Sequence, residues 1–221
     1  MLTLYHLWLS PPCRLVRLIM EEKGLKYDLK AEKIWERRPE FLKLNAAGEV
    51  PVLVNGKNHI AGFTAIIEFL EETNPTPPLL PGDAHARAEV RRLVEWFLFK
   101  FKKEVSDPLL SEKVLKKYLK LGVPDTDIIR AGQTNLGHHM AYLSHLTGEM
   151  NYLAGDEFSL ADLAAAAHIS TVDYLGEINW ADYPDVRAWY AKVKSRKSFR
   201  PLLKDHIAGM PPPDHYTSLD F

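Results

Sequence analysis

Hydrophobic positions in the first 74 residues change period several times, as expected for an α/β unit. The strand-like stretches are 2–6, 27–34, 50–54 and 59–60, and the stretches of helical period are 14–24, 39–44 and 64–72. Asn55-Gly56 is typical of a hairpin turn, and Gly24 of a helix end. The predicted order of elements is therefore β-α-β-α-β-β-α.

From residue 84 onward the hydrophobic period is helical throughout. Ser159 followed by Asp162 has the spacing of a capping box at a helix start. The expected helices are 84–103, 111–121, 127–147, 158–169 and 185–195. Four prolines between Asn74 and Asp83 favour neither helix nor strand and indicate a linker. The predicted units are an α/β domain (1–74), a linker (75–83), an all-helical domain (84–209) and a proline-rich tail (210–221).

Composition and charge exclude several classes of function. Because 28 Lys and Arg face 29 Asp and Glu, we expect no nucleic-acid binding that depends on net positive charge. Residues 87–120 nevertheless hold ten Lys and Arg against five Asp and Glu, which predicts a basic helical face. A single cysteine excludes a disulfide framework, and the clustered histidines His138, His139 and His145 are not spaced for one metal ion. With neither a signal peptide nor a membrane span in the pattern, we expect a cytoplasmic protein.

Candidate chemistry lies at the turn Leu9-Ser10-Pro11-Pro12-Cys13-Arg14, before the first helix. A hydroxyl at a helix N-terminus stabilises a neighbouring thiolate, because the amides and dipole of the first turn favour negative charge. Ser10 is therefore a candidate activator, with a simple helix cap as the alternative. Cys13 is a weaker candidate nucleophile, and its alternative is a small buried side chain.

The element order, the linker and the helical second half resemble the glutathione transferase superfamily, whose first half is thioredoxin-like. The turn around Ser10, the segment Gly48–Leu53, the capping box and the late helix start Tyr183–Trp189 carry this resemblance. It implies that the Ser10 hydroxyl activates the thiol of glutathione. It also implies a cis peptide at Pro51, with the backbone of Val50 offered to the cysteinyl unit.

One departure from the family lies before the helix at 64–72. An acidic residue and a serine normally bind the γ-glutamyl group there, whereas this chain has Gly62 and Phe63, and only Thr64 can replace the serine. Two missing hydrogen bonds to charged groups weaken glutathione binding by roughly a hundredfold or more. We therefore expect an inherited glutathione cleft without efficient catalysis. An active transferase that uses Ser10, or another acidic small ligand in the cleft, remains the alternative.

Two further segments suggest a protein partner. Trp35, beside Arg37 and Arg38, has the composition of an interface anchor, with packing on its own domain as the alternative. The tail contains three consecutive prolines and ends in Leu219, Asp220 and Phe221, the form of a recognition peptide unless it folds back onto the chain. Together with the missing acid and serine, these segments resemble the division-associated members of the superfamily. That resemblance implies binding to the tubulin-like protein FtsZ, bundling of its filaments by a homodimer, and a tail that contacts other division proteins.

Overall fold

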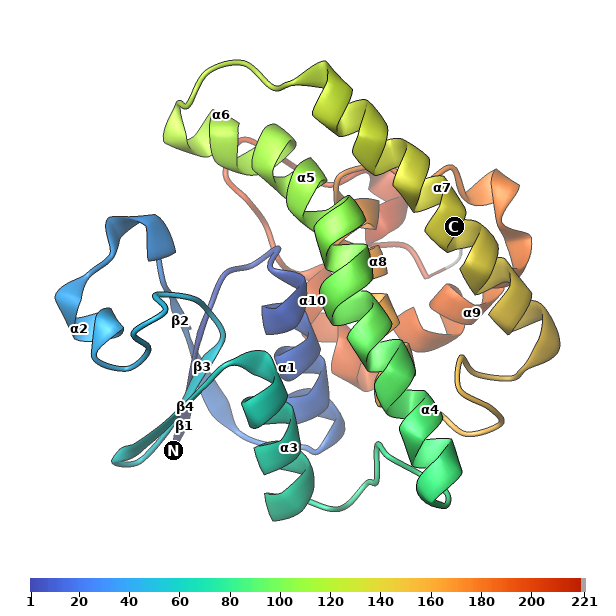
Figure 1. Ribbon diagram of the computed structural model, residues 1–221, viewed down its shortest axis with the longest axis horizontal. Coiled ribbons are helices and arrows are strands. Elements are labelled where there is room, and N and C mark those ends of the chain that lie inside the picture. Colours follow the sequence, from blue (N-terminus) through green and yellow to red (C-terminus); the bar gives the residue numbers. More distant parts are fainter. Residues whose placement is uncertain (220–221) are drawn as a thin grey trace.

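The computed structural model describes residues 1–219 and places a small sheet beside a larger body of helices (Figure 1). The four strands lie in the order β2-β1-β3-β4, with β1 parallel to β2 and antiparallel to β3, and with β4 antiparallel to β3. The strands are β1 (Leu2–His6), β2 (Tyr27–Ala31), β3 (Val52–Asn55) and β4 (Asn58–Ala61). The order of elements predicted from the changes of period is confirmed, and the sheet they form is mixed.

The hairpin between β3 and β4 turns one residue later than predicted. Asn55 pairs with Asn58, so the two loop residues are Gly56 and Lys57 rather than Asn55 and Gly56. Gly56 has a φ of 62°, and Lys57 does not share that left-handed conformation. A type II′ turn needs only one left-handed residue, and Gly56 supplies it. The turn therefore forms at Gly56 and Lys57, one residue later than predicted.

Helices cover both faces of the sheet because residues alternate sides along a strand. Leu4 is fully buried in the core shared with α1 and α3, whereas Tyr5 contacts Phe41 of α2 at 5.5 Å between ring centroids. α1 ends as predicted, since Gly24 has a φ of 62° and the Leu25 amide donates to the Met20 carbonyl. The helical elements are α1 (Pro11–Glu22), a 3₁₀ turn (Ile34–Glu36), α2 (Pro39–Leu42) and α3 (Phe63–Thr73).

The second half begins with one long helical run where two separate helices were predicted. It passes through α4 (Ala84–Glu95), a wide π-helical stretch (Trp96–Ser106), α5 (Asp107–Leu110), a second π-helical stretch (Ser111–Leu115) and α6 (Lys116–Leu119). The predicted break near Pro108 is wrong. The widened turns accommodate that proline: the Asp107 amide donates five residues back to Lys102, and Asn135 Nδ2 donates to the Glu104 carbonyl at 3.2 Å.

The other helices of the second half are α7 (Thr126–Glu149), α8 (Leu160–Tyr174), α9 (Pro184–Lys194) and α10 (Arg200–Leu203), with 3₁₀ turns at Trp180–Asp182, Lys197–Phe199 and Asp214–Tyr216. Three of them, α7 to α9, follow the predicted order, whereas α10 was not predicted. The capping box at the start of α8 is confirmed: the Ala161 amide donates to the Ser159 hydroxyl, and the Ser159 amide donates to Asp162.

α8 is the centre of the molecule (Figure 1). Every residue from Leu160 to Tyr174 is buried, and α8 packs against both α1 and α4. The segment 75–83 joins the two halves closely, because Leu79 is 1% exposed and its carbonyl accepts from the Leu160 amide at 2.8 Å. A single hydrophobic core therefore runs through both halves.

Candidate functional site

Ser10 stands at the N-cap of α1, where the sequence placed it, but its hydroxyl does not cap the helix. The next two residues are Pro11 and Pro12, which have no amide hydrogen. The Arg14 amide is already used, since it donates to the Ser10 carbonyl at 2.9 Å. Of the first helical amides only that of Cys13 is left to face an anion. The expected cradle of free amides beside Ser10 is therefore much smaller than in an ordinary helix N-terminus.

Cys13 lies one turn into α1 and is fully buried. Burial raises the pKa of its thiol to about 11, and a hydrogen bond from the Ser10 hydroxyl offsets only part of this effect. At neutral pH the thiol is protonated and inaccessible to a substrate. The geometry thus fits the alternative of a small buried side chain and gives no support to a nucleophile.

The loop before β3 has the conformation that the resemblance implied. The Val50–Pro51 peptide is cis, Val50 is half-buried, and Gly48 has a φ of 72°. The Asn45 side chain donates to the Glu49 carbonyl at 2.8 Å and so restrains the loop. The linker contains a second cis peptide, Thr76–Pro77, which the sequence analysis did not anticipate.

The start of α3 lacks the polar side chains that the family uses. Gly62 is the N-cap residue with a φ of 89°, no side chain caps the helix, and Thr64 is exposed. The ring of Phe63 packs edge-on against Phe99, with 5.7 Å between centroids. Phe99 belongs to the π-helical stretch of the second half and is 57% exposed. An aromatic contact between the two halves therefore occupies the first turn of α3.

Trp35 makes a similar contact further along the same helical run. It lies in the 3₁₀ turn after β2, half-buried, and its ring is edge-on to Tyr118 of α6 at 5.4 Å. This contact is with the other domain, and so differs from the packing within the first domain that was the alternative to a partner anchor. Of the neighbouring arginines, Arg38 forms an ion pair with buried Glu32 at 2.5 Å, whereas Arg37 is exposed.

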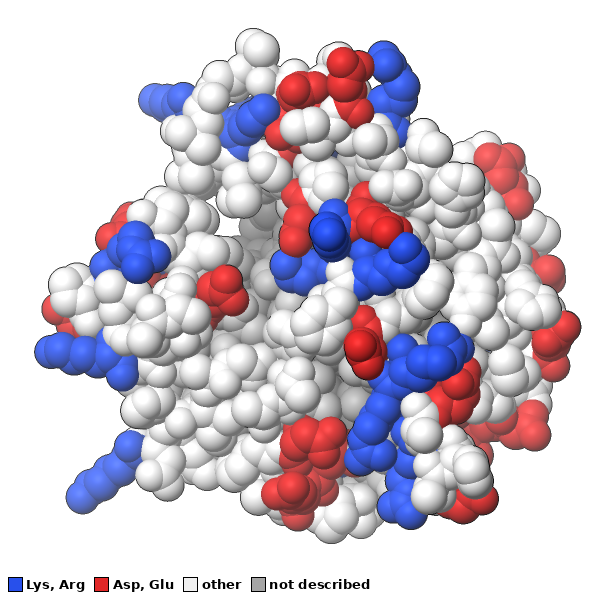
Figure 2. Space-filling view, viewed as in Figure 1, with Lys and Arg blue, Asp and Glu red and all other residues white. Residues whose placement is uncertain are grey.

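The basic residues of 87–120 do not form a continuous positive surface. Figure 2 shows Lys and Arg interleaved with Asp and Glu on the face that carries the long helical run. Six of the ten basic side chains pair with a carboxylate: Arg91 with Glu68, Arg92 with Glu89, Lys100 with Glu104, Lys102 with Asp107, Lys113 with Glu177 and Lys116 with Glu112. Four of these carboxylates lie within 87–120 and only Glu68 and Glu177 lie outside it, so ion pairs neutralise two of the five excess positive charges.

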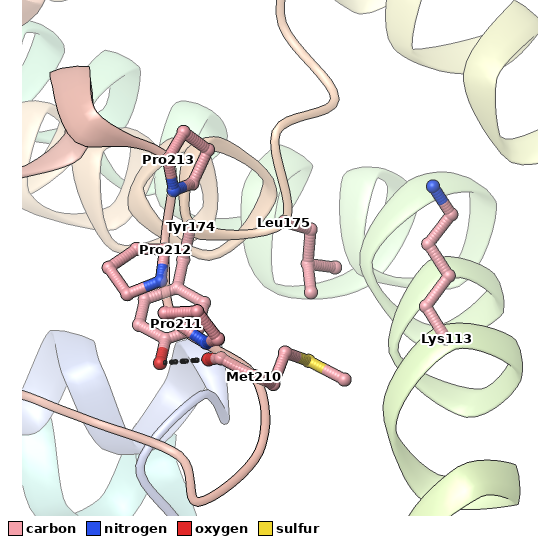
Figure 3. A pocket seen from close by; sticks show the side chains of 7 residues that line it. All are labelled: Lys113, Tyr174, Leu175, Met210, Pro211, Pro212 and Pro213. Atoms are coloured by element: carbon pink, nitrogen blue, oxygen red, sulfur yellow. Dashed lines mark hydrogen bonds between the residues drawn. The ribbon is translucent and has the colours of Figure 1, made fainter.

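The tail folds onto the second half instead of extending as an arm. Tyr216 is fully buried, and the Tyr174 hydroxyl donates to the Met210 carbonyl at 2.8 Å. The three prolines of the tail and Tyr174 line an open groove of about 390 Å³, which Lys113 also borders (Figure 3). Leu219 is 44% exposed. Asp220 and Phe221, the remaining candidate partner residues, lie outside the described residues.

A buried polar cluster behind Ser10 escaped the sequence analysis. Arg14 and Arg17 of α1 are 0% and 1% exposed and share the carboxylate of Asp205, at 3.3 and 2.7 Å. Burial opposes the charge of Arg14, but the contacts with Tyr216 and Asp205 prevail and raise its pKa above the ordinary value. Only the placement of two arginines on the apolar face of a helix could have signalled this cluster.

Residues 1–219 form neither a metal site nor a membrane-spanning helix. No three His, Cys, Asp or Glu side chains come together there as a metal site requires. His139 is instead held between Trp96 and Glu104, each at 3.0 Å. No helix in that range is long and apolar enough to span a bilayer.

Comparison with known proteins agrees with the geometry. Residues 4–78 match the model of the glutathione S-transferase N-terminal domain, and residues 131–197 match that of the C-terminal domain. The chain belongs to the glutathione S-transferase family. Among its relatives, FtsZ-localized protein A of Caulobacter vibrioides (strain NA1000 / CB15N) is 45% identical, covering 99% of this chain and 98% of that protein.

Solved structures give the same fold under two names. A glutathione S-transferase from Rhodospirillum rubrum F11 is 49% identical with a TM-score of 0.97, and the match covers 100% of both chains. FzlA from C. crescentus is 45% identical with a TM-score of 0.96, covering 100% of this chain and 99% of that one. The fold predicted from the sequence is thus confirmed, whereas overall similarity does not separate a glutathione S-transferase from FtsZ-localized protein A.

Proposed function

We propose that this chain is a regulator of bacterial cell division that binds FtsZ and bundles its filaments, with little or no glutathione catalysis. The observation that carries this proposal is the start of α3, where Gly62 and Phe63 replace the acid and the serine and where the Phe63 ring packs on Phe99. The name of the relative that matches nearly the whole chain supplies the partner.

Three features of the inherited cleft support the loss of catalysis. Pro11 and Pro12 remove amides beside Ser10, and the Cys13 thiol is buried with a raised pKa. The Trp35–Tyr118 contact joins the two halves in addition to the Phe63–Phe99 contact. Two aromatic contacts between the two halves and few polar side chains at the start of α3 suit a protein surface better than the capture of a charged tripeptide.

The proposed binding surface is centred on Trp35, with Arg37 and Arg38 beside it. Half-buried tryptophan and arginine are the residues that most often dominate the energetics of protein interfaces. Bundling requires at least two filament-binding surfaces, which a homodimer with twofold symmetry provides. The exposed side chain of Leu219, with Asp220 and Phe221, is the proposed contact with other division proteins, and the division site is the proposed location.

Co-sedimentation with assembled FtsZ filaments tests the proposal. We expect the unaltered chain to pellet with filaments, and Trp35→Glu to lose most of this binding because it places a charge in the centre of the surface. Leu29→Glu is a matched control, since Leu29 is an exposed apolar residue of β2 at 37% exposure and should leave binding unchanged. Pelleting of the unaltered chain no greater than without filaments contradicts the proposal.

A second candidate function is an active glutathione transferase that uses Ser10. Two observations favour it: Ser10 keeps its place at the start of α1, and the cis peptide at Val50–Pro51 is retained. Calorimetric titration with glutathione separates the two candidates. Binding in the micromolar range that Ser10→Ala leaves intact while conjugation activity disappears supports the enzyme. Undetectable binding removes it.

A further inference from the structure

The loop between β1 and α1 is held in place largely by residues outside it. Within the loop, the Ser10 amide donates to the Leu7 carbonyl at 3.2 Å. Arg14 Nε donates to the Trp8 carbonyl at 2.9 Å, and the Thr171 hydroxyl of α8 donates to the Leu9 carbonyl at 3.2 Å. A change at Arg14 is therefore transmitted directly to the backbone that carries Trp8 and Ser10.

Arg14 reaches the tail with its other nitrogens. Its Nη1 donates to the Tyr216 hydroxyl at 3.0 Å and to the Ser170 hydroxyl at 2.7 Å. The Tyr216 hydroxyl in turn donates to the Leu202 carbonyl at 3.2 Å. All of these side chains are buried, so no solvent replaces a contact that is lost. Tyr216 and Trp8 are thus linked through one guanidinium group.

The tail itself is fastened at its two ends more than along its length. At one end Tyr174 bonds to the Met210 carbonyl, and at the other the Lys194 amine donates to the His215 carbonyl at 3.1 Å. Between them the stretch Met210–Pro213 borders the open groove of about 390 Å³ (Figure 3). Because this groove is open to solvent, one side of the segment packs against no protein atoms, and its polar attachments matter more.

We propose that the docked tail acts as a strap that fixes the β1–α1 loop, with Tyr216 and Arg14 as positioning residues. Release of the tail removes one acceptor from Arg14, and the guanidinium then shifts away from the Trp8 carbonyl. Because coupling is reciprocal, a partner that captures the tail loosens the loop, and a ligand that orders the loop tightens the tail. The coupling belongs to the chain alone and does not depend on FtsZ or on glutathione.

Hydrogen exchange of the full chain, measured by mass spectrometry, tests the strap. Tyr216→Phe removes the hydroxyl and keeps the ring that packs on Tyr174 at 5.2 Å. We expect amides of residues 7–13 to exchange about tenfold faster, the effect of losing one hydrogen bond to a charged group, while amides of α7 keep their rate. Tyr152→Phe is the matched control, because the Tyr152 ring lies on Phe158, far along the chain from Arg14.

A second variant loosens the tail without touching Arg14. His215→Ala removes the contact between His215 Nε2 and Asp173 at 2.8 Å and leaves Tyr216 intact. We expect faster exchange in residues 210–217 together with a smaller acceleration in residues 7–13. The proposal is overturned if either variant speeds the tail while the loop keeps its rate. It is equally overturned if all peptides accelerate together, since that result indicates a global loss of stability.

Discussion

Trp35 of the first half lies edge-on to Tyr118 of the second half, with 5.4 Å between ring centroids and 61° between ring planes. Tyr118 is 54% exposed, so the contact sits at the surface where the two halves meet. An edge-to-face pair of this kind contributes about 0.5–1.5 kcal/mol beyond the area it buries. The Trp35–Tyr118 pair thus fastens the first domain to the far end of the long helical run.

A double-mutant cycle measures that contribution. We expect Trp35→Ala and Tyr118→Ala to lower the free energy of unfolding non-additively, with a coupling energy of about 1 kcal/mol in urea titrations. Trp35→Ala combined with Phe99→Ala serves as the control and should be additive, because Phe99 contacts Phe63 instead. Additivity in both cycles means that the Trp35–Tyr118 contact does not form in solution.

Restoring a serine at the start of α3 should restore part of the affinity for glutathione. Phe63→Ser supplies a hydroxyl to the first turn of the helix and removes the ring. One hydrogen bond to a charged group is worth about 1.5–3 kcal/mol, so calorimetry should record roughly tenfold to hundredfold tighter binding. Phe63→Ala is the control, since it removes the same ring without adding a hydroxyl. An equal gain in that control assigns the effect to steric relief.

The companion change at Gly62 should help less. Gly62 has a φ of 89°, and although a Cβ atom there meets nothing within 4 Å, the backbone conformation is unfavourable for any other residue. The strain costs about 1–3 kcal/mol, which cancels the ion pair that Gly62→Glu provides. We expect Gly62→Glu to bind glutathione no more tightly than the unaltered chain and to unfold at a lower urea concentration.

Acid should destabilise the protein through His168. This side chain is fully buried beside Ser106, and burial lowers its pKa to about 3 from 6.5. Below pH 6.5 the unfolded chain therefore binds more protons than the folded one, and the free energy of unfolding falls as the pH falls. At pH 4.5 the loss from this residue amounts to about 2–3 kcal/mol.

Urea unfolding at several pH values isolates this effect. His168→Gln should reduce the slope of stability against pH by one proton between pH 6.5 and 4.5. Some slope should remain, because burial also lowers the pKa of His6, to about 4. Identical slopes for His168→Gln and the unaltered chain would show that His168 is accessible to protons in the folded state.

Asp162 should be among the least replaceable residues of the second half. Its carboxylate is 0% exposed and accepts from the Ser159 amide, the Leu153 amide and Trp189 Nε1, at 3.0, 3.1 and 2.9 Å. Asp162→Ala leaves these buried donors without an acceptor, and we expect a loss of at least about 3 kcal/mol by thermal or urea unfolding. Ser159→Ala removes only a cap and should cost about 1 kcal/mol. Similar losses in both variants contradict this assignment.

Short sequence motifs predicted the helix ends that depend on residues only a few positions apart. Gly24 ends α1 and Ser159 with Asp162 begins α8, because a left-handed residue and a capping box act within a few positions. The gap predicted between helices 84–103 and 111–121 does not occur, because Asn135 on another helix satisfies the Glu104 carbonyl that Pro108 leaves without its helical donor. The sequence around Pro108 does not indicate the contact with Asn135.

The sequence located the candidate site residues, but it did not predict the hydrogen bonds and contacts around them. Ser10 and the Val50–Pro51 peptide were located through short motifs, but the effect of Pro11 and Pro12 on the helix amides was overlooked although it is legible in the sequence. The pairing of Arg14 with Asp205 joins residues 191 positions apart, and the contact between Trp35 and Tyr118 depends on how two halves pack. Such contacts follow from tertiary structure alone.

The complete burial of α8 has a consequence for how the protein folds during its synthesis on the ribosome. The inner face of α1 is covered by a helix that begins at Leu160, so the N-terminal unit is synthesised long before its largest apolar surface finds a partner. A fragment that stops at the linker should expose that surface and aggregate. Folding of the first half must therefore wait for the second, and the two family domains form one cooperative unit rather than two independent modules.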